Sequence, residues 1–104
     1  MQLRLVFHPD AELEFAESYI WYDEKSDGLG ESFRNCVNTV LNNIKKYPLH
    51  HPKKKLNFRE VLVPAFPFVI VYEIIEKRNL IHIASIFHGK RNPKLKYRKF
   101  QNTK

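Results

Sequence analysis

The sequence predicts an α+β domain in which a helical hairpin packs on a mostly antiparallel four-stranded sheet, in the order β-α-α-β-β-β. Apolar residues recur at helical spacing over residues 9–47, whereas β-branched and aromatic residues form near-continuous runs over residues 56–87. The length of 104 residues suits one compact domain. We expect this domain to span residues 1–98 and to be followed by a flexible basic tail over residues 99–104.

A short strand and a helix are expected first. Residues 3–7 favour a strand, and Pro9 suits the first position of a helix, because its missing N–H would have no partner there. A Ser in place of His8 would supply a better side-chain cap at this junction. The polar stretch over residues 23–28 then breaks the helix.

A second helix is predicted over residues 29–47, and Pro48 stops it. Its core positions follow one another in steps of three and four: Leu29, Phe33, Val37, Val40, Leu41 and Ile44. Two helices joined by so short a break form an antiparallel hairpin. Residues 49–55 are then expected to form a loop.

Three strands follow in the second half of the chain. Residues 56–63 are predicted to form the first of them, and they end at a Pro-rich turn. Residues 68–75 and 80–87 are nearly continuous apolar runs joined by a polar turn, which indicates a hairpin in the middle of a sheet. The tail begins near Pro93 and is expected to include one short helical turn.

The charge is distributed unevenly along the chain. Residues 1–44 carry eight acids and three bases, a net charge of −5, whereas residues 45–104 carry three acids and fifteen bases, a net charge of +12. A basic half of this kind attracts polyanions, either nucleic acid or an acidic protein. Over residues 99–104 alone, a solvated tail explains the charge as well.

Several classes of protein are excluded by what the sequence lacks. No signal peptide is recognisable, and no apolar stretch approaches the roughly 20 residues that span a bilayer. The single cysteine, Cys36, cannot form an internal disulfide and is expected to pack in the second helix. No metal-ligand pattern accompanies the histidines. We therefore expect a cytoplasmic protein without a cofactor, a metal or a membrane partner.

The residues at the joints of this order carry a family resemblance. They are Phe7-His8-Pro9-Asp10-Ala11, Trp21-Tyr22, Gly28-Leu29-Gly30 with Phe33, Tyr47-Pro48, Arg59, Phe66-Pro67-Phe68, Ile70-Val71-Tyr72, Ile86-Phe87-His88 and Arg91-Asn92-Pro93. In this order and at this spacing the chain resembles the RelE/ParE toxin superfamily of type II toxin–antitoxin modules, which include plasmid stabilization systems. The resemblance covers nearly the whole chain, from Val6 to about Tyr97.

This resemblance implies growth arrest and an antitoxin partner, with a higher-order toxin–antitoxin complex as one form. RelE-like members cut messenger RNA, usually on the ribosome, whereas ParE-like members poison DNA gyrase through protein contacts. The 66–68 turn and the tail from residue 87 to residue 93 look more ParE-like, so we favour gyrase inhibition. The alternatives are a metal-independent endoribonuclease and a non-toxic relative that only binds.

If the chain is a ribonuclease, its expected catalytic residues are Arg59, His88, Arg91 and Tyr97. Such cleavage needs a base, an acid and cations around one phosphate, so we expect these residues to converge on one edge of the sheet. The residues expected to bind nucleic acid or another target are Lys53, Lys54, Lys55, Lys90 and Lys94.

Simpler roles are open for the same residues. Arg59 can pair with Glu60 or Glu73, and Tyr97 can pack the tail onto the sheet. The run of lysines at 53–55 can be a solvated loop. Trp21 and Tyr22 are expected to be core or partner-facing residues and not platforms for nucleic acid.

Overall fold

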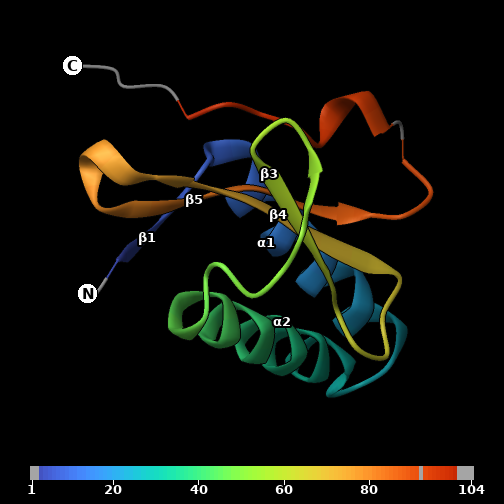
Figure 1. Ribbon diagram of the computed structural model, residues 1–104. Coiled ribbons are helices and arrows are strands. Elements are labelled where there is room, and N and C mark those ends of the chain that lie inside the picture. The colour runs from blue at the N-terminus through green and yellow to red at the C-terminus, as the bar shows by residue number, and fades with distance from the viewer. Residues whose placement is uncertain (1–2, 92, 101–104) are drawn as a thin grey trace.

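The computed structural model describes residues 3–91 and 93–100 (Figure 1). Its elements are β1 (Arg4–Phe7), α1 (Pro9–Lys25), α2 (Leu29–Lys46), β2 (Lys53–Lys55), β3 (Phe58–Leu62), β4 (Phe68–Ile75) and β5 (Leu80–His88), with the short 3₁₀ helices η1 (Glu76–Arg78) and η2 (Pro93–Leu95). No helix within the described ranges is long and apolar enough to cross a membrane.

The strands form one sheet in the order β1-β5-β4-β3-β2. β1 runs parallel to β5, and every other neighbouring pair is antiparallel. The predicted α+β class and the mostly antiparallel sheet are confirmed. The sheet has five strands instead of four, because the lysines predicted as a loop form the edge strand β2, with Lys53 opposite Arg59. A run of three exposed lysines has no apolar alternation, so its pairing depends on backbone hydrogen bonds that no side-chain pattern reveals.

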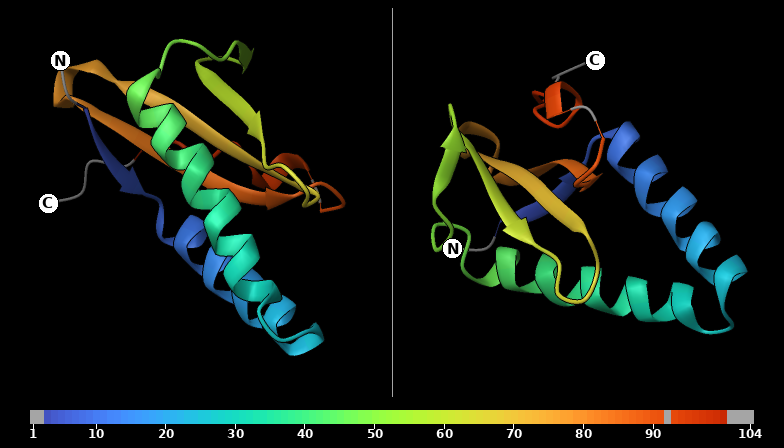
Figure 2. Two further views of the ribbon diagram at one scale, coloured as in Figure 1. Left: turned by 90° about the horizontal axis from the view of Figure 1, so that it is seen from below. Right: turned by 90° about the vertical axis from the view of Figure 1, so that its right-hand side faces the viewer.

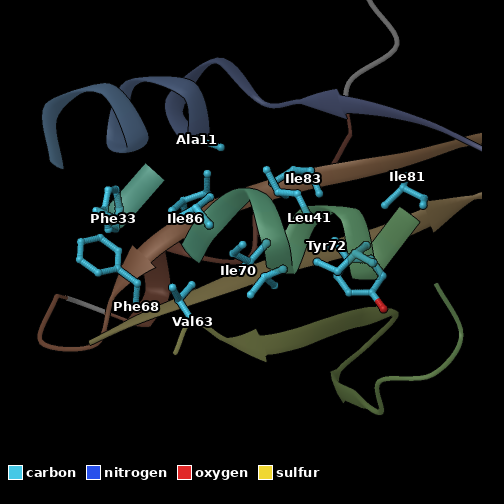
Figure 3. Close-up of a cluster of buried hydrophobic side chains, with 13 residues drawn as sticks. Ala11, Phe33, Leu41, Val63, Phe68, Ile70, Tyr72, Ile81, Ile83 and Ile86 are labelled. Carbon is cyan, nitrogen blue, oxygen red and sulfur yellow. The ribbon is translucent and has the colours of Figure 1, made fainter. Parts of the chain in front are cut away.

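Both helices cover the same face of the sheet (Figure 2). The hairpin between them is tight, since a Cβ added to Gly30 would lie 2.7 Å from the backbone oxygen of Tyr19. The core lies between the hairpin and the sheet (Figure 3), and its buried residues are Ala11, Phe33, Val37, Val40, Leu41, Ile44, Val63, Phe68, Ile70, Tyr72, Ile81, Ile83 and Ile86. The predicted core stripe of the second helix is therefore confirmed from Phe33 to Ile44, and only Leu29 is left out.

The opposite face of the sheet is covered by the C-terminal segment over residues 93–100, which we call the strap (Figure 2). Beneath it lies a second cluster of buried residues, formed by Phe58, Val69, Val71, Ala84 and Phe87, with Tyr97 packed against it. Ala84 is the extra residue of a β-bulge, because Val71 pairs with Ser85 while Tyr72 pairs with Ile83.

Part of the tail predicted over residues 99–104 is described. Residues 101–104 lie outside the described ranges. The N–H of Phe100 donates to Glu73 at 2.8 Å, and the Phe100 ring lies 5.3 Å from the His82 ring. The packed segment therefore extends as far as Phe100.

His8 caps α1 despite the expectation that a serine would serve better. Its Nδ1 atom accepts the N–H of Asp10 at 3.0 Å, while Pro9 occupies the first helical position. Burial lowers the pKa of His8 and outweighs the opposing influence of Asp10. The neutral imidazole is the form that can accept this hydrogen bond.

Glu14 connects the helix, the sheet and the strap. β1 ends with Phe7 opposite Ile83, so the continuation of β5 has no strand beside it on that edge. The Glu14 side chain, only 7% exposed, covers this edge and accepts the N–H of Ile86 at 3.0 Å. Its two oxygens also accept from the Arg98 guanidinium at 3.1 and 2.8 Å. This buried carboxylate therefore replaces a missing strand and holds the strap.

Removing the charge of Glu14 is expected to destabilise the whole domain. Glu14→Gln removes the closer of the two carboxylates that pair with Arg98, leaving only Asp10 at 3.6 Å, and should lower the free energy of unfolding by about 3 kcal/mol. The exposed Glu17 on the same helix provides the matched control, Glu17→Gln, which should change it by less than about 0.5 kcal/mol. Urea unfolding measures both, and equal midpoints for the two variants would contradict this role.

The His8 cap makes stability depend on pH. Folding lowers the pKa of His8. The neutral cap therefore contributes fully to the free energy of unfolding above about pH 6.5, and this contribution is lost as the pH falls through the pKa of His8 in the folded protein. Wild type should therefore lose stability relative to His8→Ser below that pH, since serine caps without titrating. Burial also lowers the pKa of His51, which makes the stability of both proteins depend on pH. Thermal unfolding should therefore be used to follow the difference in stability between wild type and His8→Ser, in which the effect of His51 cancels. A constant difference across pH 5–8 would rule out the cap as its source.

Candidate functional site

Arg59 lies at the β2 side of the sheet. Its Nη1 atom donates to the backbone oxygen of His51 at 2.6 Å. It lines a cavity of about 440 Å³ together with Leu49, Lys53, Asn57, Ile74, Ile75, Glu76 and Lys77. The alternative pairing of Arg59 with Glu60 or Glu73 is not seen, because those two carboxylates are engaged by the strap.

His88 and Arg91 lie at another place, where β5 ends beside α1. They line a cavity of about 520 Å³ with Glu17, Ser18, Trp21, Tyr22, Pro67 and Phe68. The His88 ring packs against Phe68, and its Nδ1 atom accepts the N–H of Lys90 at 3.0 Å. Arg91 lies over the Phe87 ring, and its Nη1 atom is 3.5 Å from a Glu14 oxygen. His88 therefore shapes the turn after β5 in addition to facing the cavity.

Tyr97 lies on the outer face, within the strap. Its hydroxyl donates to Glu60, which also pairs with the Lys96 ammonium at 3.3 Å. Burial and the neighbouring Glu60 carboxylate raise the pKa of Tyr97 to about 12, so the phenol keeps its proton at neutral pH. Lys55 reaches the same place, with its Nζ atom 5.3 Å from the Tyr97 ring centre. The simpler role for Tyr97, packing the strap onto the sheet, is the one that this geometry provides.

The predicted convergence on one edge is wrong. Arg59 pairs with Tyr72, and His88 pairs with Phe68, so the two are separated by four positions of β4, about 13 Å, as well as by two strand spacings. Tyr97 lies across the sheet from the helix layer. Alternation of side chains between the two faces separates residues that seemed adjacent along the strands.

The five predicted binding lysines are also dispersed. Lys53, Lys54 and Lys55 are all exposed on the edge strand β2. Lys90 lies in the turn after β5, and Lys94 is exposed in η2. Within residues 3–91 and 93–100, no group of three His, Cys, Asp or Glu side chains is placed to hold a metal ion.

Three carboxylates are the residues that sequence reasoning missed. Glu14, Glu60 and Glu73 each bind a different part of the strap, through Arg98, through Lys96 and Tyr97, and through the N–H of Phe100. A Glu73 oxygen also lies 3.1 Å from the Nδ1 atom of buried His82. For Glu73 the available signal was a single acid inside an otherwise apolar strand, whereas Glu14 lies in a helix with several other acids and gave no such signal.

The exposed face of α1 carries large apolar side chains. Leu13, Ile20 and Trp21 are 55%, 56% and 54% exposed. Trp21 also forms a cation–π contact with Lys25, whereas its neighbour Tyr22 packs against the Phe33 and Phe66 rings of the core. Of the aromatic pair that closes the first helix, Tyr22 is therefore a core residue, and Trp21 faces outward where a partner can reach it.

This arrangement of two helices on an antiparallel sheet is similar to solved bacterial toxins. The E. coli toxin RelE, in a mutant form in the free state, is similar with a TM-score of 0.66 at 16% sequence identity over 86% of each chain. A chromosomal ParDE toxin–antitoxin system from P. aeruginosa is similar with a TM-score of 0.60 at 15% identity, over 84% of this chain and 96% of that chain. At these identities the likeness shows the fold alone.

The sequence itself matches a family model over residues 5–93. The family is the ParE toxin of the type II toxin–antitoxin system, parDE. The chain therefore belongs to the ParE toxin family, within the RelE/ParE superfamily, and membership implies an antitoxin partner. A comparison with curated proteins found no match.

The Tyr97 hydroxyl is expected to hold the strap on the sheet. Tyr97→Phe removes a hydrogen bond to a charged group and should raise the population of the detached strap by about tenfold. Trypsin cleavage after Lys96 and Arg98, followed by mass spectrometry, measures that population. The exposed Tyr47 gives the matched control, since Tyr47→Phe should leave these cleavage rates unchanged. Equal cleavage rates in all three proteins would contradict this role of the Tyr97 hydroxyl.

Proposed function

We propose that this toxin arrests growth by inhibiting DNA gyrase through protein contacts, and that it does not cleave messenger RNA. The observation that carries the proposal is the separation of Arg59, His88 and Tyr97 into three places. Membership in the ParE family supports the same conclusion.

Cleavage of RNA by its own 2′-hydroxyl needs a base and an acid within hydrogen-bonding reach of one phosphate, about 3 Å. His88 and Arg59 are too far apart to act on the same phosphate in this fold. The Tyr97 hydroxyl donates to a carboxylate whose negative charge would repel a phosphate. The geometry therefore favours a function that needs no catalytic residues.

The exposed surface of α1 carries side chains of the kind that bind other proteins. A half-exposed tryptophan beside a cavity is the type of side chain that dominates protein–protein binding energies. Trp21, Ile20 and Leu13 are the large apolar side chains that α1 exposes to solvent. We infer that this face of α1 contacts gyrase.

The uneven charge distribution is suited to the antitoxin. The net charge of +12 over residues 45–104 gives an acidic partner a field that speeds the encounter, while apolar anchors supply most of the affinity.

The first test is a gyrase supercoiling assay with the purified chain. Wild type should inhibit supercoiling, and Trp21→Ala should weaken inhibition about tenfold or more, since truncating a central aromatic anchor typically costs at least 2 kcal/mol. Tyr47 is a matched control because it is a similarly exposed aromatic residue at the C-cap of the other helix, and Tyr47→Ala should inhibit like wild type. Circular dichroism spectra of both variants should match that of wild type, which checks that both are folded.

A purified translation system provides the opposing measurement. Messages should stay intact at toxin concentrations that inhibit gyrase. Cleavage of messages on the ribosome, abolished by Arg59→Ala or His88→Ala, would overturn the proposal in favour of a ribonuclease. Inactivity in both assays and in an expressing bacterium would point to the non-toxic binding relative.

A further inference from the structure

The sheet has a notch on the β3 side of β4. β4 continues to Ile75, but β3 pairs with it only from Tyr72 back to Val69. Glu73, Ile74 and Ile75 therefore pair with β5 on one side and have no partner from β3 on the other. In Figure 1 the β4–β5 hairpin projects beyond the end of β3. The notch is the cavity of about 440 Å³ that Arg59 lines.

Cations and apolar side chains line this notch together. Lys53 of β2 and Lys77 of η1 are exposed residues of its lining, and Arg59 is held in the lining by its hydrogen bond to the His51 carbonyl. Leu49, Ile74 and Ile75 supply the apolar part of the lining, and Glu76 is its one carboxylate. The notch thus combines an open strand edge, three cations and an apolar surface formed by Leu49, Ile74 and Ile75, which we call the apolar floor.

We propose that this notch is a docking site for an acidic, extended segment of a partner protein, which adds a short strand to the free edge of β4. Backbone hydrogen bonds to residues 73–75 would supply affinity, as in other cases of strand addition. Alternate side chains of the segment would face the apolar floor, and its carboxylates would reach Lys53, Arg59 and Lys77. The inference does not depend on which molecule the toxin poisons.

Charge argues against a second copy of this chain as the occupant. Lysines beside an open strand edge discourage pairing between identical molecules, and this protein carries a net charge of +7. Across the notch, the three cations exceed the single carboxylate, so an incoming strand must bring negative charge.

Nucleic acid fits the notch less well than a protein segment does. Single-stranded nucleic acid is bound by stacking its bases on aromatic rings as well as by cations. The side chains that line the notch within the described residues include no aromatic ring, whereas they include three large aliphatic ones. An aliphatic floor suits the side chains of an extended peptide.

The test uses fluorescently labelled probes and the full-length chain. The first probe is a short capped peptide of alternating Glu and Val; its two controls carry Gln in place of Glu, or N-methyl groups on alternate amides. Fluorescence anisotropy should show binding of the first probe and about tenfold or greater weakening with either control. Amide hydrogen exchange should slow at residues 73–76 when the first probe binds, and at no other strand edge.

A charge-reversed variant locates the site. Lys53→Glu combined with Lys77→Glu should weaken the peptide about tenfold or more. Lys45→Glu combined with Lys99→Glu changes the net charge equally at exposed positions outside the notch, and should weaken peptide binding by less than about threefold. Both variants should keep the far-ultraviolet circular dichroism spectrum of wild type.

Three outcomes would overturn the proposal. The first is equal binding of the N-methylated and unmodified peptides, which would mean that no strand is added. The second is protection of β1 instead of residues 73–76. The third is tighter binding of a single-stranded RNA probe than of the acidic peptide, with loss in the Lys53→Glu, Lys77→Glu variant, which would make the notch a nucleic-acid site.

Discussion

The fold depends on one buried carboxylate that has to satisfy three different elements. Glu14 lies on α1, accepts an amide of β5 where no strand continues beside it, and pairs with Arg98 of the strap. Desolvating a carboxylate is costly, and the cost is offset here because its oxygens accept several charge-assisted hydrogen bonds. The helix layer, the sheet edge and the outer layer are therefore fixed relative to one another at a single point.

Carboxylates also hold the strap on the outer face of the sheet. Glu60 and Glu73, two of the three acids in the basic half, are both used to bind the strap. The Lys96 ammonium is thereby paired with Glu60, whereas the cations of β2 and Lys77 remain exposed. The fold therefore determines which of the many cationic side chains are exposed to solvent and to partners.

Local patterns predicted most of the fold, and tertiary geometry accounts for what they missed. The spacing from Phe33 to Ile44 and the apolar runs of β4 and β5 were sufficient, because a buried face imposes its period on the sequence. The strand formed by Lys53–Lys55 has no such period. The predicted convergence of Arg59, His88 and Tyr97 was wrong for a related reason. Their positions depend on the strand register and on the face of the sheet that each residue occupies, and neither can be read from a single sequence.

The parallel pairing of β1 with β5 affects how the chain can assemble. Arg4 and Leu80 are neighbours in space although most of the chain lies between them, and contacts of such long sequence separation are slow to form. During synthesis, the residues of β1 must wait unpaired until β5 has been made. A fragment that ends before β5 therefore cannot complete the native sheet, so the full sheet forms only after the C-terminal part of the chain has been made.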